Sequence, residues 1–204
     1  LSALSNDKSL ISIQSQIEEI LKIADALPDE DPKFDALMEI VKKKQLEPKN
    51  KLMIFSSFRH TLHYLYNRLT EQGLRVGLIH GDVIDEERRA LRKRFNPNQM
   101  PCEDKNALDI LLFSEVGCEG LDYQFCDCMV NYDLPWNPMK VEQRIGRIDR
   151  NGQTSESVAI YNMVTPGTVD ADIYERCLMR IGVFHSSIGD CEDILGEITG
   201  EIRK

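Results

Sequence analysis

QRIGRIDRNGQ, residues 143–153, is the stretch that says most about the fold and chemistry of this chain. It places Arg147 and Arg150 three residues apart. On a helix, side chains at that spacing share a face, so both guanidinium groups can point at one target. Arginine suits a phosphate target because it stays charged and presents a planar fork of donors, and two such forks suit a phosphoryl-transfer transition state. The alternative is a solvated helix face on which Glu142 and Asp149 offset the arginines.

Three further segments precede this stretch, and together they carry a family resemblance. They are KLMIFSSF (51–58), LIHGD (78–82) with Arg88 behind it, and DILLFSEVGCEGLDYQ (109–124). In this order they resemble motifs IV, IVa and V of the second RecA-like lobe of superfamily 2 helicases, and QRIGRIDRNGQ resembles motif VI. Within that superfamily the set is similar to the Swi/Snf-type ATPases. The sequences of motif V and of the NYDLPWNPMKVEQRIGRIDR segment are most similar to those of the bacterial branch that includes the RNA-polymerase-associated ATPase.

The pattern of apolar residues predicts an α/β domain. Apolar runs predict strands at 52–55, 75–80, 109–113, 128–132 and 157–164. Helical spacing predicts helices at 10–27, from Pro32 to Val41, around 62–72, at 85–94, at 138–149 and at 168–182, with Asp31 and Asp85 as N-caps. Strands that alternate with helices indicate a mostly parallel sheet. The resemblance implies a RecA-like three-layer fold with helical extensions at both ends.

Three regions are expected along the chain. Residues 1–48 form a helical lead-in and inter-lobe linker, and the stretch 42–50 (KKKQLEPKN) at its end is interpreted as polar linker. Residues 49–185 form the helicase C-terminal domain, and 186–204 form an acidic extension. The chain opens with Leu-Ser-Ala and has no signal-like or membrane-spanning run, so we expect a piece of a larger cytoplasmic protein, nucleoid-associated if bacterial.

Bulk composition narrows the function classes only mildly. The 204 residues are 42% hydrophobic, which indicates a globular chain, and the net charge is −9. A dedicated DNA-binding domain usually has a basic excess, but phosphate contacts need only a local patch. Such patches occur at 88–94 and at Arg144, Arg147 and Arg150. The six cysteines form no CxxC pair, so no metal site is predicted.

Polar residues follow the predicted strands at the edge where parallel sheets bind ligands. Ser56, His80, Ser114 and Asp133 stand at these positions. A serine at a strand tip can bond a phosphate, or it can cap the following helix, and a histidine there is more often structural. The resemblance implies a nucleic-acid track. Its expected residues are Ser56, Ser57, His80, Gly81, Arg88, Ser114 and Gly117.

The resemblance also implies a nucleotide face. Arg147 and Arg150 are expected to act as arginine fingers on ATP and Mg²⁺, which a first lobe binds for the most part. Gly120 and Asp122 are expected to lie toward the nucleotide and that lobe, and Gln143 to couple the nucleotide to the track. The implied activity is ATP-driven translocation on nucleic acid, preferentially duplex DNA, with RNA polymerase or another protein–DNA complex as a further partner.

The first half of an ATPase site is missing from this sequence. No Gly-Lys pair of a Walker A loop occurs, and the only Asp-Glu-Asp, residues 29–31, lies between two prolines rather than after a strand. The chain by itself is therefore expected not to hydrolyse ATP. Two other readings remain open: a stand-alone module that binds nucleic acid or protein, and a catalytically dead scaffold, against which the arginine pair argues.

Overall fold

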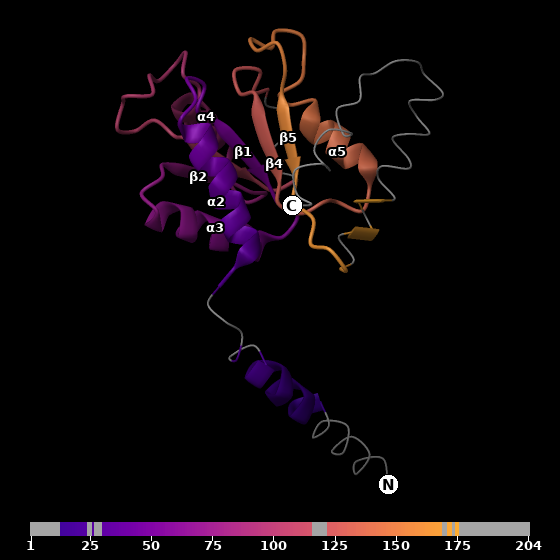
Figure 1. Cartoon of the computed structure of the whole chain (residues 1–204). Helices are drawn as coiled ribbons and strands as arrows, with labels where there is room; N and C mark the ends of the chain where they lie inside the picture. The colour runs from indigo at the N-terminus through magenta and orange to yellow at the C-terminus, as the bar shows by residue number, and fades with distance from the viewer. Residues whose placement is uncertain are drawn as a thin grey trace. The chain divides into compact units, whose positions relative to one another are not determined.

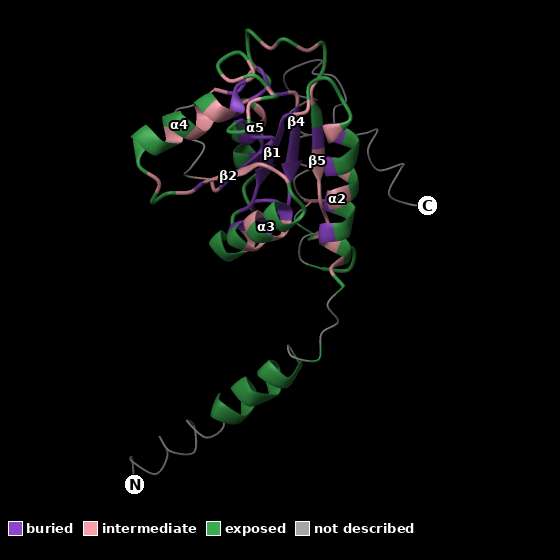
Figure 2. Cartoon of the chain, turned by 90° about the vertical axis from the view of Figure 1, so that its left-hand side faces the viewer, coloured by how far each residue is buried: buried purple, intermediate pink, exposed green. Residues whose placement is uncertain are grey.

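The computed structural model describes residues 13–23, 26, 30–115, 122–168, 171–172 and 174–175. The chain divides into two compact units between Leu37 and Met38, whereas the polar linker had suggested a boundary after residue 48. Residues 13–23 are helical and exposed along their whole length, as the green ribbon of Figure 2 shows. No helix among the described residues is long and apolar enough to cross a membrane.

A five-stranded parallel sheet forms the centre of the second unit (Figure 1). Its strands are β1 (Leu52–Phe55), β2 (Val76–Ile79), β3 (Ile110–Phe113), β4 (Cys128–Asn131) and β5 (Ala159–Asn162). Their order is β2-β3-β1-β4-β5, and every pairing is parallel. The predicted α/β class and all five predicted strands are therefore confirmed.

The helices agree with the prediction in place but differ at their ends. They are α2 (Pro32–Gln45), α3 (Arg59–Glu71), α4 (Asp85–Phe95) and α5 (Pro138–Ile145). Asp31 caps α2 as predicted, since its Oδ1 accepts a hydrogen bond from the Phe34 backbone N–H at 3.0 Å. Of the helix predicted at 168–182, residues 171–172 and 174–175 are described and helical, and the rest lies outside the described residues.

Three end positions were predicted wrongly. The helix α2 continues into the predicted linker, because Lys44 is buried and bonded there. Asp85 is the first helical residue rather than the cap, a position that Ile84 occupies without a side-chain bond. The helix α5 ends at Ile145 instead of 149, because the chain tightens into a turn from Gly146 onward.

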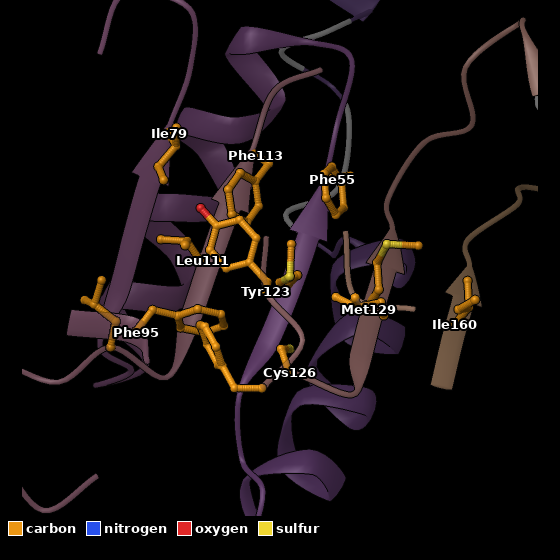
Figure 3. Packing of buried hydrophobic residues seen from close by; sticks show 13 residues of the cluster. Phe55, Ile79, Phe95, Leu111, Phe113, Tyr123, Cys126, Met129 and Ile160 are labelled. Atoms are coloured by element: carbon orange, nitrogen blue, oxygen red, sulfur yellow. The ribbon is translucent and has the colours of Figure 1, made fainter. Parts of the chain in front are cut away.

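The main hydrophobic core covers one face of the sheet (Figure 3). The strand register sets Met53 beside both Leu111 and Met129, so alternate residues of neighbouring strands share this face. Large side chains from outside the sheet complete the cluster, among them Phe95, Tyr123, Phe125 and Ile148. On α3, Leu62, Leu65 and Leu69 are fully buried, and this helix packs against β2 and β3. In Figure 2 the central strands β1 and β4 are buried while the outer surfaces of α3 and α4 are exposed.

Candidate functional site

The sheet topology brings the predicted track residues to one edge. Parallel strands end at the same edge, and Ser56, His80 and Ser114 directly follow β1, β2 and β3. Two inter-strand bonds continue past the strand ends there, from Ser56 N to the Phe113 carbonyl (3.1 Å) and from Ser114 N to the Ile79 carbonyl (3.0 Å). These three tips therefore lie side by side.

The tip of β1 is fastened internally by Asp133. Ser56 is fully buried, and its hydroxyl makes a short hydrogen bond to the Asp133 carboxylate. The Ser57 N–H donates to the other carboxylate oxygen at 2.7 Å. The expectation that Ser56 presents its hydroxyl to a phosphate is therefore not met in this structure, because the hydroxyl already has a buried partner. Ser57 is exposed and presents its own hydroxyl at the surface.

The tip of β2 is shaped by Arg88. The guanidinium donates to the backbone carbonyls of Val83 (2.8 Å), Gly81 (3.3 Å) and His80 (3.4 Å). Arg88 therefore holds the turn rather than extending freely toward solvent. The His80 Nδ1 accepts from the Asp82 N–H at 3.3 Å, and Gly81 is exposed. Of the predicted residues at this tip, Gly81 is the most accessible.

The tip of β3 carries Ser114 and Glu115, and both are partly buried. The Glu115 carboxylate accepts hydrogen bonds from the Ser57 hydroxyl (3.3 Å) and from Lys140 of α5, the latter short. Gly117 and Gly120, which were predicted to contribute to the track and to the nucleotide face, lie outside the described residues.

The segment QRIGRIDR begins on α5 and ends in a tight turn. Asn137 caps the helix by accepting from the Met139 N–H at 3.1 Å, and Pro138 occupies the first turn, where its missing N–H costs nothing. Beyond Ile145 the regular helix gives way to mixed bonds. Arg147 N donates to the Arg144 carbonyl (3.1 Å) and Ile148 N to that of Ile145 (2.9 Å), while Asp149 N also donates to the Ile145 carbonyl (2.9 Å). Arg147 therefore lies in the turn after α5 and Arg150 in the bend that follows it, so the two residues do not share one helix face as the sequence suggested.

The two predicted finger residues meet motif V in this turn. The Arg150 guanidinium is 57% exposed and pairs with the Asp122 carboxylate at 2.6 Å. The Arg147 carbonyl accepts from the Tyr123 N–H at 2.8 Å. The Arg147 Nε is buried and has no hydrogen-bond partner among the described residues. Gln143 is exposed on α5. The structure thus brings Asp122 and Arg150, which the family resemblance assigned separately to the nucleotide face, into direct contact.

Arg92 of α4 also binds the Asp122 region, through the backbone. Its Nε donates to the Asp122 carbonyl at 2.9 Å, and its guanidinium carbon lies 5.8 Å from the centre of the Tyr123 ring. Asp122 is therefore held at its backbone by Arg92 and at its carboxylate by Arg150. Among the described residues, no group of three or more His, Cys, Asp or Glu side chains could hold a metal ion.

Several residues of this edge escaped the sequence interpretation. Glu115 and the buried Arg144 connect the strand tips, and Phe58 (62% exposed) and Trp136 (70%) are large exposed rings that follow β1 and β4. An aromatic residue in the loop that follows a strand was a usable signal for the two rings. Arg144 gave no such signal, since in sequence it resembles its exposed neighbours in the QRIGRIDR run.

Comparison with known proteins agrees with this geometry. The family described as helicase conserved C-terminal domain matches residues 32–152, more than half of the chain. The chain is 38% identical over 149 residues to the uncharacterized ATP-dependent helicase YqhH of Bacillus subtilis, covering 73% of this chain and 25% of that protein. It is 27% identical to the CHD3-type chromatin-remodeling factor CHR7 of Arabidopsis thaliana (94% of this chain, 17% of the relative). It is 34% identical to the RNA polymerase-associated protein RapA of Vibrio parahaemolyticus (62% and 12%).

A solved structure shows the same fold. The C-terminal part of the Fun30 ATPase domain superposes with a TM-score of 0.62 at 22% identity, covering 83% of this chain and 53% of that one. The RecA-like α/β prediction is thereby confirmed. The chain spans 12–25% of the length of the three curated relatives named above. The match over residues 32–152 and the shared architecture place the chain in one family: it belongs to the helicase conserved C-terminal domain family.

Proposed function

We propose that this chain is the second motor lobe of an ATP-dependent nucleic-acid translocase that follows duplex DNA. The observation that carries the proposal is the Arg150–Asp122 pair. Asp122 stands in motif V, two residues after Gly120 in the chain. Its carboxylate fixes Arg150, whose side chain is more than half exposed. A fork of donors held in place but open to solvent is what a finger residue requires.

The chemistry of this face fits a nucleotide. The Arg147 Nε is a buried donor without a partner among the described residues, so an approaching phosphate oxygen would satisfy it. Asp122 keeps Arg150 oriented until a more strongly charged acceptor arrives. Mg²⁺ and ATP, when bound by the first lobe, supply the metal ion and the γ-phosphoryl group. Arg147 and Arg150 would then stabilise the charge on the transferred group, and Gln143, exposed on α5, would couple the nucleotide to the track.

The nucleic-acid track follows the carboxyl edge of the sheet. Ser57, His80, Gly81 and Ser114 are the proposed contacts, with Arg88 shaping the turn after β2 and Ser56 fixing the tip of β1. Backbone and hydroxyl donors bind phosphate without reading base sequence, as a translocase requires. The exposed rings of Phe58 and Trp136 add apolar area beside these polar groups.

The rest of the motor is proposed to lie in a first lobe of the same full-length protein. The relatives that share this domain are four or more times longer than the part they match, and one of them is an ATP-dependent helicase. No Walker A loop occurs within these 204 residues, so we propose that they do not hydrolyse ATP alone. RNA polymerase is a candidate partner because one relative, RapA, is named for its association with it.

ATP hydrolysis by the full-length protein, with and without duplex DNA, tests this function. We expect turnover that rises on adding duplex DNA and falls by about 10³- to 10⁵-fold in Arg150→Ala. Turnover should also be lost in Arg147→Lys, because the point charge of lysine does not replace the bidentate fork of arginine. Arg59→Ala is the matched control. Arg59 has the same 57% exposure and a 2.5 Å pair with Asp82, but it lies on α3, so its loss should leave the DNA-free rate unchanged.

Each outcome has a distinct meaning. DNA-stimulated turnover that is lost in Arg150→Ala, together with an unchanged DNA-free rate in Arg59→Ala, supports the motor and the finger together. Turnover that is indifferent to Arg150 would show that motif VI has another role. No turnover in the wild-type protein would favour a scaffold, and stimulation by RNA alone would change the substrate from DNA to RNA.

A further inference from the structure

Arg144 differs from the other arginines of the QRIGRIDR segment because it is turned into the protein. Its side chain is 2% exposed, and it is the largest fully buried side chain described. A buried guanidinium is costly unless its donors are satisfied by well-placed acceptors. What Arg144 contacts therefore shows what its burial achieves.

Its acceptors come from the tips of three strands. Nη1 donates to the Asn131 Oδ1 (2.8 Å) and to the Asp133 carbonyl (3.1 Å), at the end of β4. Nη2 donates to the Ser57 Oγ after β1 (3.3 Å) and to the Glu115 Oε1 after β3 (3.4 Å). The guanidinium carbon also lies 5.4 Å from the centre of the Phe55 ring. One side chain of α5 thus ties β1, β3 and β4 together at the edge proposed to carry the track.

The backbone of the same residue begins the finger turn. The Arg144 carbonyl accepts from the Arg147 N–H at 3.1 Å, with only Ile145 and Gly146 between them. A shift of Arg144 against the strand tips therefore moves the turn that carries Arg147 and Arg150. Ser57 is exposed at the other end of this connection, so a phosphate that binds there touches a direct partner of Arg144.

We infer that Arg144 is the positioning residue through which nucleic acid bound at Ser57 sets the place of the arginine fingers. The inference rests on the proposed function and deepens it, because it names the residue that couples DNA binding to hydrolysis. Arg144 itself touches neither DNA nor nucleotide. Its planar fork is needed because lysine cannot reach Asn131, Ser57 and Glu115 from one nitrogen with the same geometry.

The alternative is that Arg144 has a purely structural role. Arg75, which stands in a comparable arginine network, is the matched control for that alternative. Arg75 donates to both Asp109 carboxylate oxygens (2.8 and 2.5 Å) and to the carbonyls of Cys102 (2.9 Å) and Asp104 (2.7 Å). It precedes β2 while Asp109 precedes β3, so this network fastens strands at the opposite edge of the sheet. Removing it should weaken the fold without disturbing the finger turn.

The experiment measures ATP hydrolysis by the full-length protein carrying Arg144→Gln, Arg144→Lys or Arg75→Gln, with saturating duplex DNA and without DNA. We expect Arg144→Gln to lower the DNA-stimulated kcat by about 10- to 100-fold, the range for a misplaced catalytic group. The KM for ATP and the Kd for duplex DNA should stay within about threefold of the wild type, because Arg144 binds neither ligand. The DNA-stimulated kcat of Arg144→Lys should lie between those of the wild type and Arg144→Gln. Arg75→Gln should lower Tm but keep the fold-stimulation of the wild type.

A double-mutant cycle of Ser57→Ala with Arg144→Lys measures the coupling directly, and the effects of the two changes on kcat should be non-additive. Fold-stimulation by DNA in the Arg144 variants equal to that of Arg75→Gln, or additive effects in the cycle, would overturn the inference while leaving the proposed function intact. If Arg144→Gln does not fold, Arg144→Lys and the cycle decide. A wild-type protein without DNA stimulation would instead refute the proposed function, and this inference with it.

Discussion

Replacing Lys44 by methionine tests how the end of α2 is fastened to the sheet. The Lys44 ammonium donates to Glu47 (2.6 Å) and, far along the chain, to Asp127 before β4 (2.7 Å), and its side chain is only 6% exposed. Methionine keeps the unbranched length of the side chain but removes the charge and its donors. Asp127 then retains one bond, from the Ser155 hydroxyl at 3.0 Å.

The expected decrease in the free energy of unfolding depends on how deeply each partner of Lys44 is buried. Glu47 is 48% exposed, so its pair contributes little, as surface pairs do. Asp127 is 17% exposed, and removing one member of a fully buried pair costs about 3–5 kcal/mol. Ser155 and partial solvation of Asp127 offset some of this cost. We therefore expect Lys44→Met to lower the free energy of unfolding by about 1–3 kcal/mol, or the Tm by about 2–4 °C per kcal/mol for a chain of this size.

The effect also has a defined pH dependence. Burial by itself lowers the pKa of Lys44, but the bonds to Asp127 and Glu47 together raise that pKa above its ordinary value of 10.5. A cation whose pKa is raised on folding stabilises the protein fully below its unfolded pKa, and that stability is lost as pH rises through the folded pKa. The difference in the free energy of unfolding between the wild type and Lys44→Met should thus be constant near neutral pH and shrink above pH 10.5.

Urea unfolding followed by circular dichroism measures both quantities. Lys43→Met is the matched control, because Lys43 is the adjacent residue of α2 but is exposed, and surface changes of this kind usually stay within about 0.5 kcal/mol. The reasoning is refuted if the two variants unfold with the same free energy, or if the difference between the wild type and Lys44→Met grows with pH.

Two further predictions concern the core. A Cβ on Gly77 would stand 2.6 Å from Leu111 Cδ1, inside van der Waals contact, so Gly77→Ala should lower the free energy of unfolding by about 1–3 kcal/mol in the same urea assay. Burial raises the pKa of the Cys126 and Cys128 thiols to about 12, so iodoacetamide at pH 8 should leave both unlabelled in the folded chain while the half-buried Cys102 reacts first, as peptide mapping would show.

Both predictions have clear contrary results. Gly77→Ala with wild-type stability would mean that the leucine side chains around β2 have room to repack. Labelling of Cys126 or Cys128 at the rate of an unfolded control would mean that the β4 region opens readily, since both thiols are buried in the structure.

The sequence predicted the sheet well because its signals are local. The three central strands, β3, β1 and β4, are short and mostly apolar runs buried on both faces, and Pro, Gly and polar stretches mark the turns between the strands. The parallel arrangement then placed Ser56, His80 and Ser114 at one edge without any knowledge of contacts. The resemblance of motifs V and VI assigned Asp122 and Arg150 to one nucleotide face, but their direct contact was not predicted.

Only the tertiary structure decided which polar residues of that edge face inward. Ser56 is buried against Asp133, which lies 77 positions further along the chain, and Arg144 is buried against Ser57, 87 positions away. Lys44 looked like part of a polar linker and is bonded to Asp127, 83 positions away. Periodicity reports the helix or strand in which a residue stands. A buried charge or hydroxyl, however, is decided by acceptors from distant segments, and these meet only once the sheet has formed.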